Sequence, residues 1–173
     1  MKSILKNIKM ILMDVDGVMT NGNIIFSSSC AEIKEFNIQD GMAISLAKLG
    51  GLKTGVITGR SSEMVKRRAE ELNYDYVSQG IDKKLAAYDI CVNRFNLSNE
   101  EICYIGDDLP DIPILLKAGF PVAVANARDE LKSFCQYTTQ NPGGSGAVRE
   151  VVEMILKAQE KFEDLIKQIE KWK

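Results

Sequence analysis

The sequence predicts a Rossmann-like α/β fold, that is, a doubly wound parallel sheet with helices on both faces. Three short, mainly apolar runs at 10–13, 53–57 and 102–106 carry this prediction. They lack the alternation of polar and apolar positions that marks a half-exposed strand, which is typical of strands covered on both faces. A fourth, short strand is expected at 76–78.

Helices are expected between these strands. Ser61 or Ser62 can cap a helix that runs to about Leu72, because a serine side chain accepts hydrogen bonds from the first free amides of a helix. Those amides lie close to the end of the preceding strand, so they also form a natural anion site. Lysines at 83 and 84 open the next helix, which runs to about Arg94.

Two carboxylates, Asp14 and Asp16, follow the first apolar run. The carboxyl ends of parallel strands form the edge at which open α/β sheets bind ligands. Two acids beside an apolar strand are unfavourable unless a cation or a ligand compensates them. The alternative is that Asp16 and Gly17 only form a turn, and the sequence further along the chain distinguishes the two interpretations.

Three later clusters favour chemistry, because each also follows a predicted strand. They contain Thr58 with Arg60, then Lys84, and finally Asp107, Asp108 and Asp111. In a doubly wound sheet these strand ends lie along one edge. Two like charges about 4 Å apart repel by roughly 4 kcal/mol at an effective dielectric near 20, so the clustered carboxylates need a cation. Oxygen ligands without histidine favour Mg²⁺.

Histidine is absent from all 173 residues. Ser-His-Asp hydrolases, histidine phosphatases and zinc hydrolases with histidine ligands are therefore excluded. The cysteines at 30, 91, 103 and 135 are far apart and form no CxxC pair. We expect them to be reduced and structural.

Composition favours a cytoplasmic enzyme with one domain, residues 1–173. The length suits one well-buried domain, and a net charge of −2 with mixed signs gives no reason to expect a nucleic acid partner. No apolar stretch approaches the roughly 20 residues of a membrane helix, and no signal peptide is evident. We therefore expect no membrane partner.

Two segments lie outside the predicted core. Residues 23–36 are expected to form a β-hairpin, which has unpaired edges and should therefore pair with copies of itself. The alternative is a hairpin packed on its own core. Near the end, the glycine-rich segment that starts at about 142 is expected to be flexible, and residues from 147 to 173 are expected to form one long amphipathic helix.

The order of the motifs, DxDG, Thr-Gly-Arg, Lys and GDDxxD, resembles the haloacid dehalogenase superfamily of phosphatases, in its subclass without a cap domain. The resemblance implies that Asp14 is the nucleophile, Asp16 the general acid and base, and Thr58 and Lys84 the phosphoryl-binding residues. It implies that Mg²⁺ is held by Asp14, the backbone carbonyl of Asp16, and Asp107, while Asp108 and Asp111 position its waters.

Within the superfamily, residues 36–41, 106–113 and 143–150 resemble tetrameric phosphatases that hydrolyse the 8-phosphate of an eight-carbon keto-deoxy sugar acid for lipopolysaccharide synthesis. The resemblance implies active sites completed by neighbouring subunits. It implies that the substrate is bound by Asp16, Asn37, Ile38, Gln39, Asp40, Gly41, Arg60, Arg68, Lys84 and Arg149. Ser45 departs from some relatives, which have a basic residue there.

Three alternatives remain open on the sequence. Phosphatases of nine-carbon sugar-acid 9-phosphates share the motifs, although their counterpart of Asp40-Gly41 tends to have serine after the aspartate. A receiver-type signalling module also combines an acidic pocket with threonine and lysine, and a non-catalytic scaffold could keep the same fold. Asp16 favours the enzyme, because a general acid is needed for the departure of an alkoxide and a receiver has no such step.

Overall fold

The computed structural model describes residues 2–29 and 32–171. Its centre is a six-stranded sheet in the order β5-β4-β1-β6-β7-β8, in which every pairing is parallel. The strands are β1 (Met10–Met13), β4 (Lys53–Ile57), β5 (Tyr76–Ser78), β6 (Ile102–Gly106), β7 (Phe120–Ala123) and β8 (Tyr137–Thr138). The predicted parallel sheet is confirmed.

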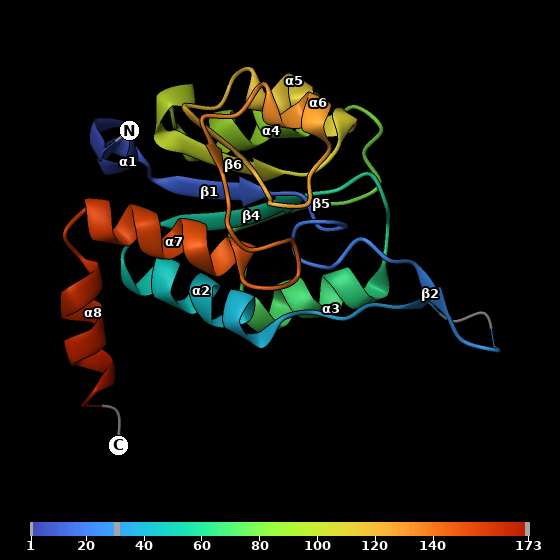
Figure 1. Cartoon of the computed structure of the whole chain (residues 1–173), viewed down its shortest axis with the longest axis horizontal. Helices are drawn as coiled ribbons and strands as arrows, with labels where there is room; N and C mark the ends of the chain where they lie inside the picture. Colours follow the sequence, from blue (N-terminus) through green and yellow to red (C-terminus); the bar gives the residue numbers. More distant parts are fainter. Residues whose placement is uncertain (1, 30–31, 172–173) are drawn as a thin grey trace.

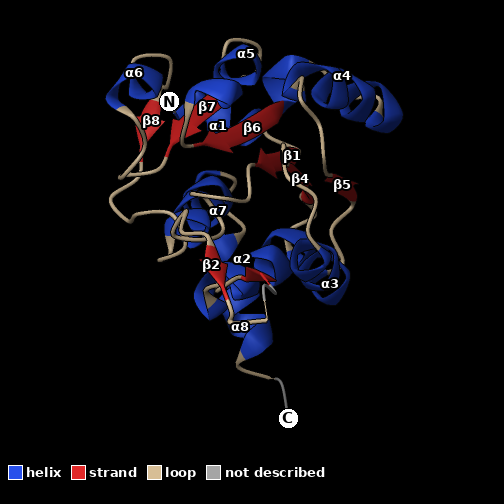
Figure 2. Cartoon of the chain, turned by 90° about the vertical axis from the view of Figure 1, so that its right-hand side faces the viewer, coloured by secondary structure: helices blue, strands red, loops and turns tan. Residues whose placement is uncertain are grey.

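Helices cover both faces of this sheet (Figures 1 and 2). One face carries α2 (Ile38–Leu49), α3 (Glu63–Leu72) and α7 (Ala147–Ala158), and the other carries α4 (Lys84–Phe95), α5 (Ile112–Leu115) and α6 (Asp129–Lys132). The chain begins with α1 (Lys2–Asn7), and short 3₁₀ turns span Asn99–Glu101 and Leu109–Asp111. The predicted doubly wound architecture is therefore confirmed, and among the described helices none is long and apolar enough to cross a membrane.

The packing of the core explains why the central strands lack an alternation of polar and apolar residues. All four side chains of β1 are fully buried, because β1 has strands on both sides and helices on both faces. Helices α2 and α7 pack against each other, with Val151, Val152 and Ile155 buried. Each such side chain contributes roughly 1.5–3 kcal/mol, and this packing fixes the strand ends that carry the polar residues.

The predicted hairpin is present and projects from the body of the molecule (Figure 1). Its strands β2 (Ile25–Phe26) and β3 (Glu32–Ile33) are antiparallel, with Ile25 opposite Ile33. They are shorter than predicted. Cys30, whose thiol was expected to be reduced, and Ala31, expected in the second strand, lie outside the described residues. Because the apolar side chains of the hairpin do not pack on the core, Phe26 is 64% exposed.

The expected C-terminal helix is present, but it is interrupted. Helix α7 ends at Ala158, and α8 (Phe162–Ile169) follows after a turn in which Glu160 has a φ of +61°. A left-handed residue cannot continue an α-helix. The turn lets Leu165 pack on the core, and Lys161 Nζ donates a hydrogen bond of 2.7 Å to the carbonyl oxygen of Gly50.

The glycine-rich segment, expected to be flexible, packs tightly on the loop that follows β1. The amide of Gly144 donates a hydrogen bond of 2.8 Å to the carbonyl oxygen of Val18. A Cβ atom at Gly143 would lie 1.7 Å from the carbonyl oxygen of Gly17. Glycine is needed here for the close approach of two backbones, so the segment supports the loop that carries Asp16.

Candidate active site

The ends of the central strands bring together the polar residues of the distant motifs. In register, Met13 of β1 pairs with Val56 of β4 and with Ile105 of β6, so the residues just beyond these strands meet at one edge. A cavity of about 500 Å³ at this edge is lined by Asp14, Asp16, Thr58, Arg60, Lys84, Asp107 and Asp108, among others. The sequence motifs separated by about a hundred residues thus share one cavity.

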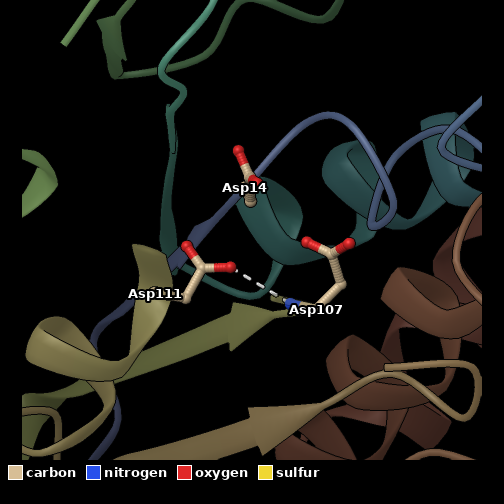
Figure 3. A group of neighbouring side chains, drawn as sticks. All are labelled: Asp14, Asp107 and Asp111. Carbon is tan, nitrogen blue, oxygen red and sulfur yellow. Dashed lines mark hydrogen bonds between the residues drawn. The ribbon is translucent and has the colours of Figure 1, made fainter. Parts of the chain in front are cut away.

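Three carboxylates form the acidic group of this site (Figure 3). Asp14 follows β1, Asp107 follows β6, and Asp111 ends the next 3₁₀ turn, with one carboxylate oxygen of each within 4.8 Å of the others. Burial and the neighbouring charge of Asp111 raise the pKa of Asp14 to about 6, although Lys84 opposes the shift. Burial, Asp14 and Asp111 raise the pKa of Asp107 to about 8. The group therefore favours a bound proton or a bound cation.

Lys84, the first residue of α4, compensates part of this charge. Its ammonium lies 2.8 Å from Asp14 Oδ2 and 2.8 Å from Asp111 Oδ1. Burial lowers the pKa of Lys84, but Asp111 and Asp14 outweigh that effect, so its pKa is raised. The lysine therefore carries a positive charge into the buried side of the cavity.

The carboxylate of Asp111 is fully buried and accepts hydrogen bonds from other residues of the site. Oδ1 accepts hydrogen bonds from Lys84 and, at 2.7 Å, from the hydroxyl of Tyr104. Oδ2 accepts one from the backbone amide of Asp107 at 3.1 Å (Figure 3). Tyr104 was not singled out from the sequence. The only signal there was a hydroxyl inside a buried strand, which needs a partner.

Gly17 keeps the loop after β1 close to the carboxylates. Its φ is +95°, and a Cβ atom there would lie 2.0 Å from Asp107 Oδ2. A side chain at this position would therefore displace Asp107 in addition to straining the backbone.

The site fits a magnesium ion. Among the described residues, Asp14 Oδ1 and Asp107 Oδ1 are buried oxygens without a hydrogen-bond partner. Such oxygens are costly unless something compensates them, and a hard cation with oxygen ligands does so. Asp108 instead caps its 3₁₀ turn, because its Oδ1 accepts a hydrogen bond of 2.8 Å from the amide of Leu109.

Magnesium should stabilise the protein more at pH 8 than at pH 6. The pKa values of Asp14 and Asp107 rise on folding from 3.8 to about 6 and about 8, so the folded chain binds these protons more tightly than the unfolded chain. The metal-free protein therefore loses stability as the pH rises from about 4 to about 8, and Mg²⁺, which competes with the protons, offsets this loss. Melting curves with Mg²⁺ and with chelator test this, and an equal Mg²⁺ effect at both pH values would contradict it.

Asp16 lies in one group with Arg60, a predicted substrate residue, and with Lys34 and Glu32, which were not identified from the sequence. Its carboxylate forms an ion pair with Lys34, at the base of the hairpin, and lies 3.7 Å from Arg60 Nε. Glu32, on β3, accepts a hydrogen bond of 2.7 Å from Arg60. The available signal was weak, because charged residues on a hairpin strand usually face solvent.

The predicted substrate residues 37–41 do not line the cavity around Asp14. Asn37 caps α2, with Oδ1 accepting a hydrogen bond of 2.7 Å from the amide of Gln39. Asp40 is buried and accepts hydrogen bonds from the amides of Gly146 at 3.1 Å and Arg149 at 2.9 Å. Within this chain Asp40 therefore ties α2 to the first turn of α7, because those amides have no partner inside their own helix.

The remaining predicted substrate residues divide between two places. Ile38 and Arg68 line a neighbouring cavity of about 420 Å³, which Lys34 also lines. Gly41 leaves the space for Arg68, since a Cβ atom there would lie 2.3 Å from its guanidinium. Arg149 forms an ion pair with Glu153 one turn along α7 and lines neither cavity.

Fold and site together define a class, the magnesium-dependent hydrolases with a Rossmann-like core. The chain is 37% identical over 159 residues to the 3-deoxy-D-manno-octulosonate 8-phosphate phosphatase of Escherichia coli K12, covering 92% of this chain and 85% of that protein. Residues 71–151 match the model of the haloacid dehalogenase-like hydrolases. The chain belongs to this family.

Solved structures agree with this assignment. A 3-deoxy-D-manno-octulosonate 8-phosphate phosphatase from Moraxella catarrhalis, in complex with magnesium, phosphate and KDO, is 42% identical, with a TM-score of 0.94 over 97% of both chains. The cobalt-bound phosphatase from Haemophilus influenzae is 33% identical, with a TM-score of 0.89, covering 92% of this chain and 93% of that one. The family resemblance found in the sequence is confirmed.

Proposed function

We propose that this protein hydrolyses 3-deoxy-D-manno-octulosonate 8-phosphate to the free sugar acid and phosphate. The observation that carries the proposal is the environment of Asp14. Lys84 holds Oδ2 at 2.8 Å, while Oδ1 is buried without a partner among the described residues, in a side chain that lines the cavity. A carboxylate held in place by a lysine at the wall of an acidic cavity is suited to act as a nucleophile.

In the proposed reaction, Asp14 attacks phosphorus and forms an aspartyl-phosphate, while the bond to the sugar oxygen breaks. Asp16, two residues further along the same loop, donates a proton to the departing alkoxide. In the second step Asp16 accepts a proton from the water that attacks the aspartyl-phosphate. This sequence replaces one difficult hydrolysis by two displacements and restores both aspartates.

Thr58 and Lys84 are proposed to bind the transferring phosphoryl oxygens. Both are buried at the cavity, and Lys84 keeps its charge beside Asp14 and Asp111. Asp14, the backbone carbonyl of Asp16, and Asp107 are proposed to hold Mg²⁺, with Asp108 and Asp111 supporting them. When bound, the ion neutralises negative charge on the phosphoryl oxygens, where a loose transition state needs stabilisation.

The sugar acid is proposed to extend from the phosphoryl site toward the neighbouring cavity. Arg60 lines the first cavity and Arg68 the second, and guanidinium groups bind carboxylates through two parallel hydrogen bonds. Arg68 Nε is buried and has no hydrogen-bond partner among the described residues. We propose that Asn37, Gln39, Asp40, Gly41 and Arg149 act on substrate through the assembled oligomer, because they line neither cavity within this chain, whereas Ile38 lines the second.

Phosphate release from a panel of esters tests this function. The panel contains the eight-carbon 8-phosphate, nine-carbon keto-deoxy acid 9-phosphates and a hexose phosphate, each with Mg²⁺ and with chelator. We expect the highest kcat/KM for the eight-carbon ester, by about 10-fold or more, since one displaced contact is worth about 1–3 kcal/mol. Preference for a nine-carbon ester would overturn the substrate, and absence of turnover on every ester would overturn the function.

We further infer a homotetramer, in which hairpins from different subunits pair. Ile25, Phe26 and Ile33 on the two short strands, with Ile24 just before them, leave an exposed apolar surface, which is unfavourable for an isolated hairpin. Light scattering should then give four times the chain mass of 19.2 kDa; the mass of a single chain would contradict the inference.

We place the reaction in the cytoplasm, in the synthesis of lipopolysaccharide precursors. The product of the proposed reaction is the sugar acid used there, and the described cysteines at 91, 103 and 135 are free, which suits a reducing compartment.

A further inference from the structure

Lys34 is an unusual residue for the base of a projecting hairpin. Its side chain is only 1% exposed, although the strand before it is short and its neighbour Ile33 is exposed. A buried ammonium requires partners of opposite charge. Lys34 has two, since it donates a hydrogen bond to Asp16 Oδ1 and lies 3.6 Å from Glu32 Oε1.

Arg60 completes a group of two cations and two carboxylates. Its Nε lies 3.7 Å from Asp16 Oδ2, and its NH2 group donates the hydrogen bond of 2.7 Å to Glu32. The formal charges of Asp16, Lys34, Glu32 and Arg60 cancel. The group joins three separate parts of the chain, namely the loop after β1, the hairpin and the loop after β4.

The orientation of Asp16 depends mainly on Lys34. Among the described residues, the Asp16 carboxylate accepts no hydrogen bond except the one from Lys34, and the contact with Arg60 is longer than a hydrogen bond. Lys34 holds Oδ1, so Oδ2 is the oxygen left for proton exchange. Asp16 is 21% exposed, and without Lys34 its side chain could rotate toward solvent.

We propose that Lys34 is a positioning residue, which holds Asp16 in the orientation that delivers a proton to the departing alkoxide. This inference rests on the proposed function, because it assigns to Asp16 the role of general acid. Lys34 takes no part in the transfer and touches no reacting atom. It also links the hairpin to the chemistry, since displacement of the hairpin would displace Lys34 and then Asp16.

Two substrates with different leaving groups can distinguish the positioning role of Lys34 from a merely structural one. A sugar alkoxide is a poor leaving group and needs the proton, whereas 4-nitrophenolate departs without it. A misplaced Asp16 should therefore slow the hydrolysis of the sugar-acid ester much more than that of 4-nitrophenyl phosphate. The comparison uses kcat/KM, which reports the step in which the aspartyl-phosphate forms and the leaving group departs.

The experiment measures both kcat/KM values for the wild type, Lys34→Met and Lys34→Arg. We expect Lys34→Met to lower kcat/KM for the sugar-acid ester about 10- to 100-fold, part of the effect of a general acid, and to lower that for the aryl ester less than about threefold. Lys34→Arg should restore most of the loss. The ratio of the two values on one preparation is independent of the folded fraction, so partial unfolding does not obscure it.

Controls separate the possible failures. Lys66→Met, at an exposed lysine of α3, should change neither value, and Lys34→Met should add little to Asp16→Asn. Equal losses on both esters, or fully additive losses in the double variant, would overturn the positioning role while leaving the proposed function intact. If the wild type hydrolyses neither ester, the proposed function fails, and the role of Lys34 fails with it.

Discussion

Asp14→Asn is expected to abolish phosphate release, with a loss of at least about 10⁴-fold, as is usual when a nucleophile is removed. An amide nitrogen and a neutral oxygen occupy nearly the same space as the carboxylate, so the surrounding structure should persist. The loss therefore belongs to the chemistry. The measurement is Mg²⁺-dependent turnover of the sugar-acid ester and of 4-nitrophenyl phosphate, and both should fail.

The same substitution should stabilise the metal-free protein. Burial and Asp111 raise the pKa of Asp14 to about 6, so at pH 8 the folded chain carries a charge that it disfavours. Asparagine removes the charge and keeps an acceptor for Lys84. At pH 8 we expect a gain on the order of 1–3 kcal/mol without metal, which diminishes as the pH falls below about 6, because Asp14 in the wild type is then protonated.

The two results expected for Asp14→Asn, a loss of activity and a gain of stability, are informative because a structural role would lower both. If Asp14→Asn lost activity and also lost stability at pH 8, the carboxylate would be a structural group, and the loss of activity would not identify a nucleophile. Asp16→Asn is the matched control, because Asp16 lies on the same loop but pairs with Lys34. It should lose activity mainly on the sugar-acid ester, without the gain in stability.

The sequence was sufficient to locate the main residues of the site, because parallel topology determines where strand ends meet. Asp14, Thr58 and Asp107 each follow an apolar run, and the register of β1 with β4 and β6 places them side by side. Lys84 could be placed as well, since it opens the helix after the next strand. These predictions depend only on local periodicity and on one general property of α/β sheets.

Contacts between distant segments could not be predicted in this way. Lys34 reaches Asp16 because the hairpin folds back at its base, which no periodicity shows. Asp40 accepts hydrogen bonds from the amides of Gly146 and Arg149, more than a hundred residues away, and no local pattern in the sequence indicates this contact. Gly143 lies against the loop of Gly17, and a glycine needed for close packing has the same sequence signature as one in a flexible segment.

Asp111→Ala is expected to destabilise the protein by about 2–4 kcal/mol, which for a chain of this size lowers the melting temperature by roughly 5–15 °C. Removal of the carboxylate leaves the hydroxyl of Tyr104 and the amide of Asp107 without their acceptor, and both groups are enclosed by β6 and the turn after it. The ammonium of Lys84 still forms its ion pair with Asp14 in this variant, so the loss of Asp111 does not leave a buried charge without a partner.

Asp111→Ala also removes the repulsion between Asp111 and the other two carboxylates, which raises the free energy of unfolding. Asp111 raises the pKa of both Asp14 and Asp107, so its removal makes their ionisation easier and recovers part of the loss at pH 8. The loss of hydrogen bonds should outweigh this relief. A buried donor without a partner costs about 1–3 kcal/mol, and removal of the Asp111 carboxylate leaves at least two such donors. Since Asp14 and Asp107 ionise less at lower pH, the relief is smaller there, and the net loss at pH 6 should exceed that at pH 8.

A graded series tests this explanation by thermal and denaturant unfolding. Tyr104→Phe removes one donor and should cost about 1 kcal/mol, whereas Asp111→Asn keeps an acceptor but turns an amide group toward a donor, so it should fall between Tyr104→Phe and Asp111→Ala. Asp129→Ala, which removes an exposed carboxylate paired with Lys132, serves as the matched control with little expected change. If Asp111→Ala were as stable as this control, the carboxylate would not be holding the strand end, and the positions of Lys84 and Asp107 would have to depend on the metal and substrate instead.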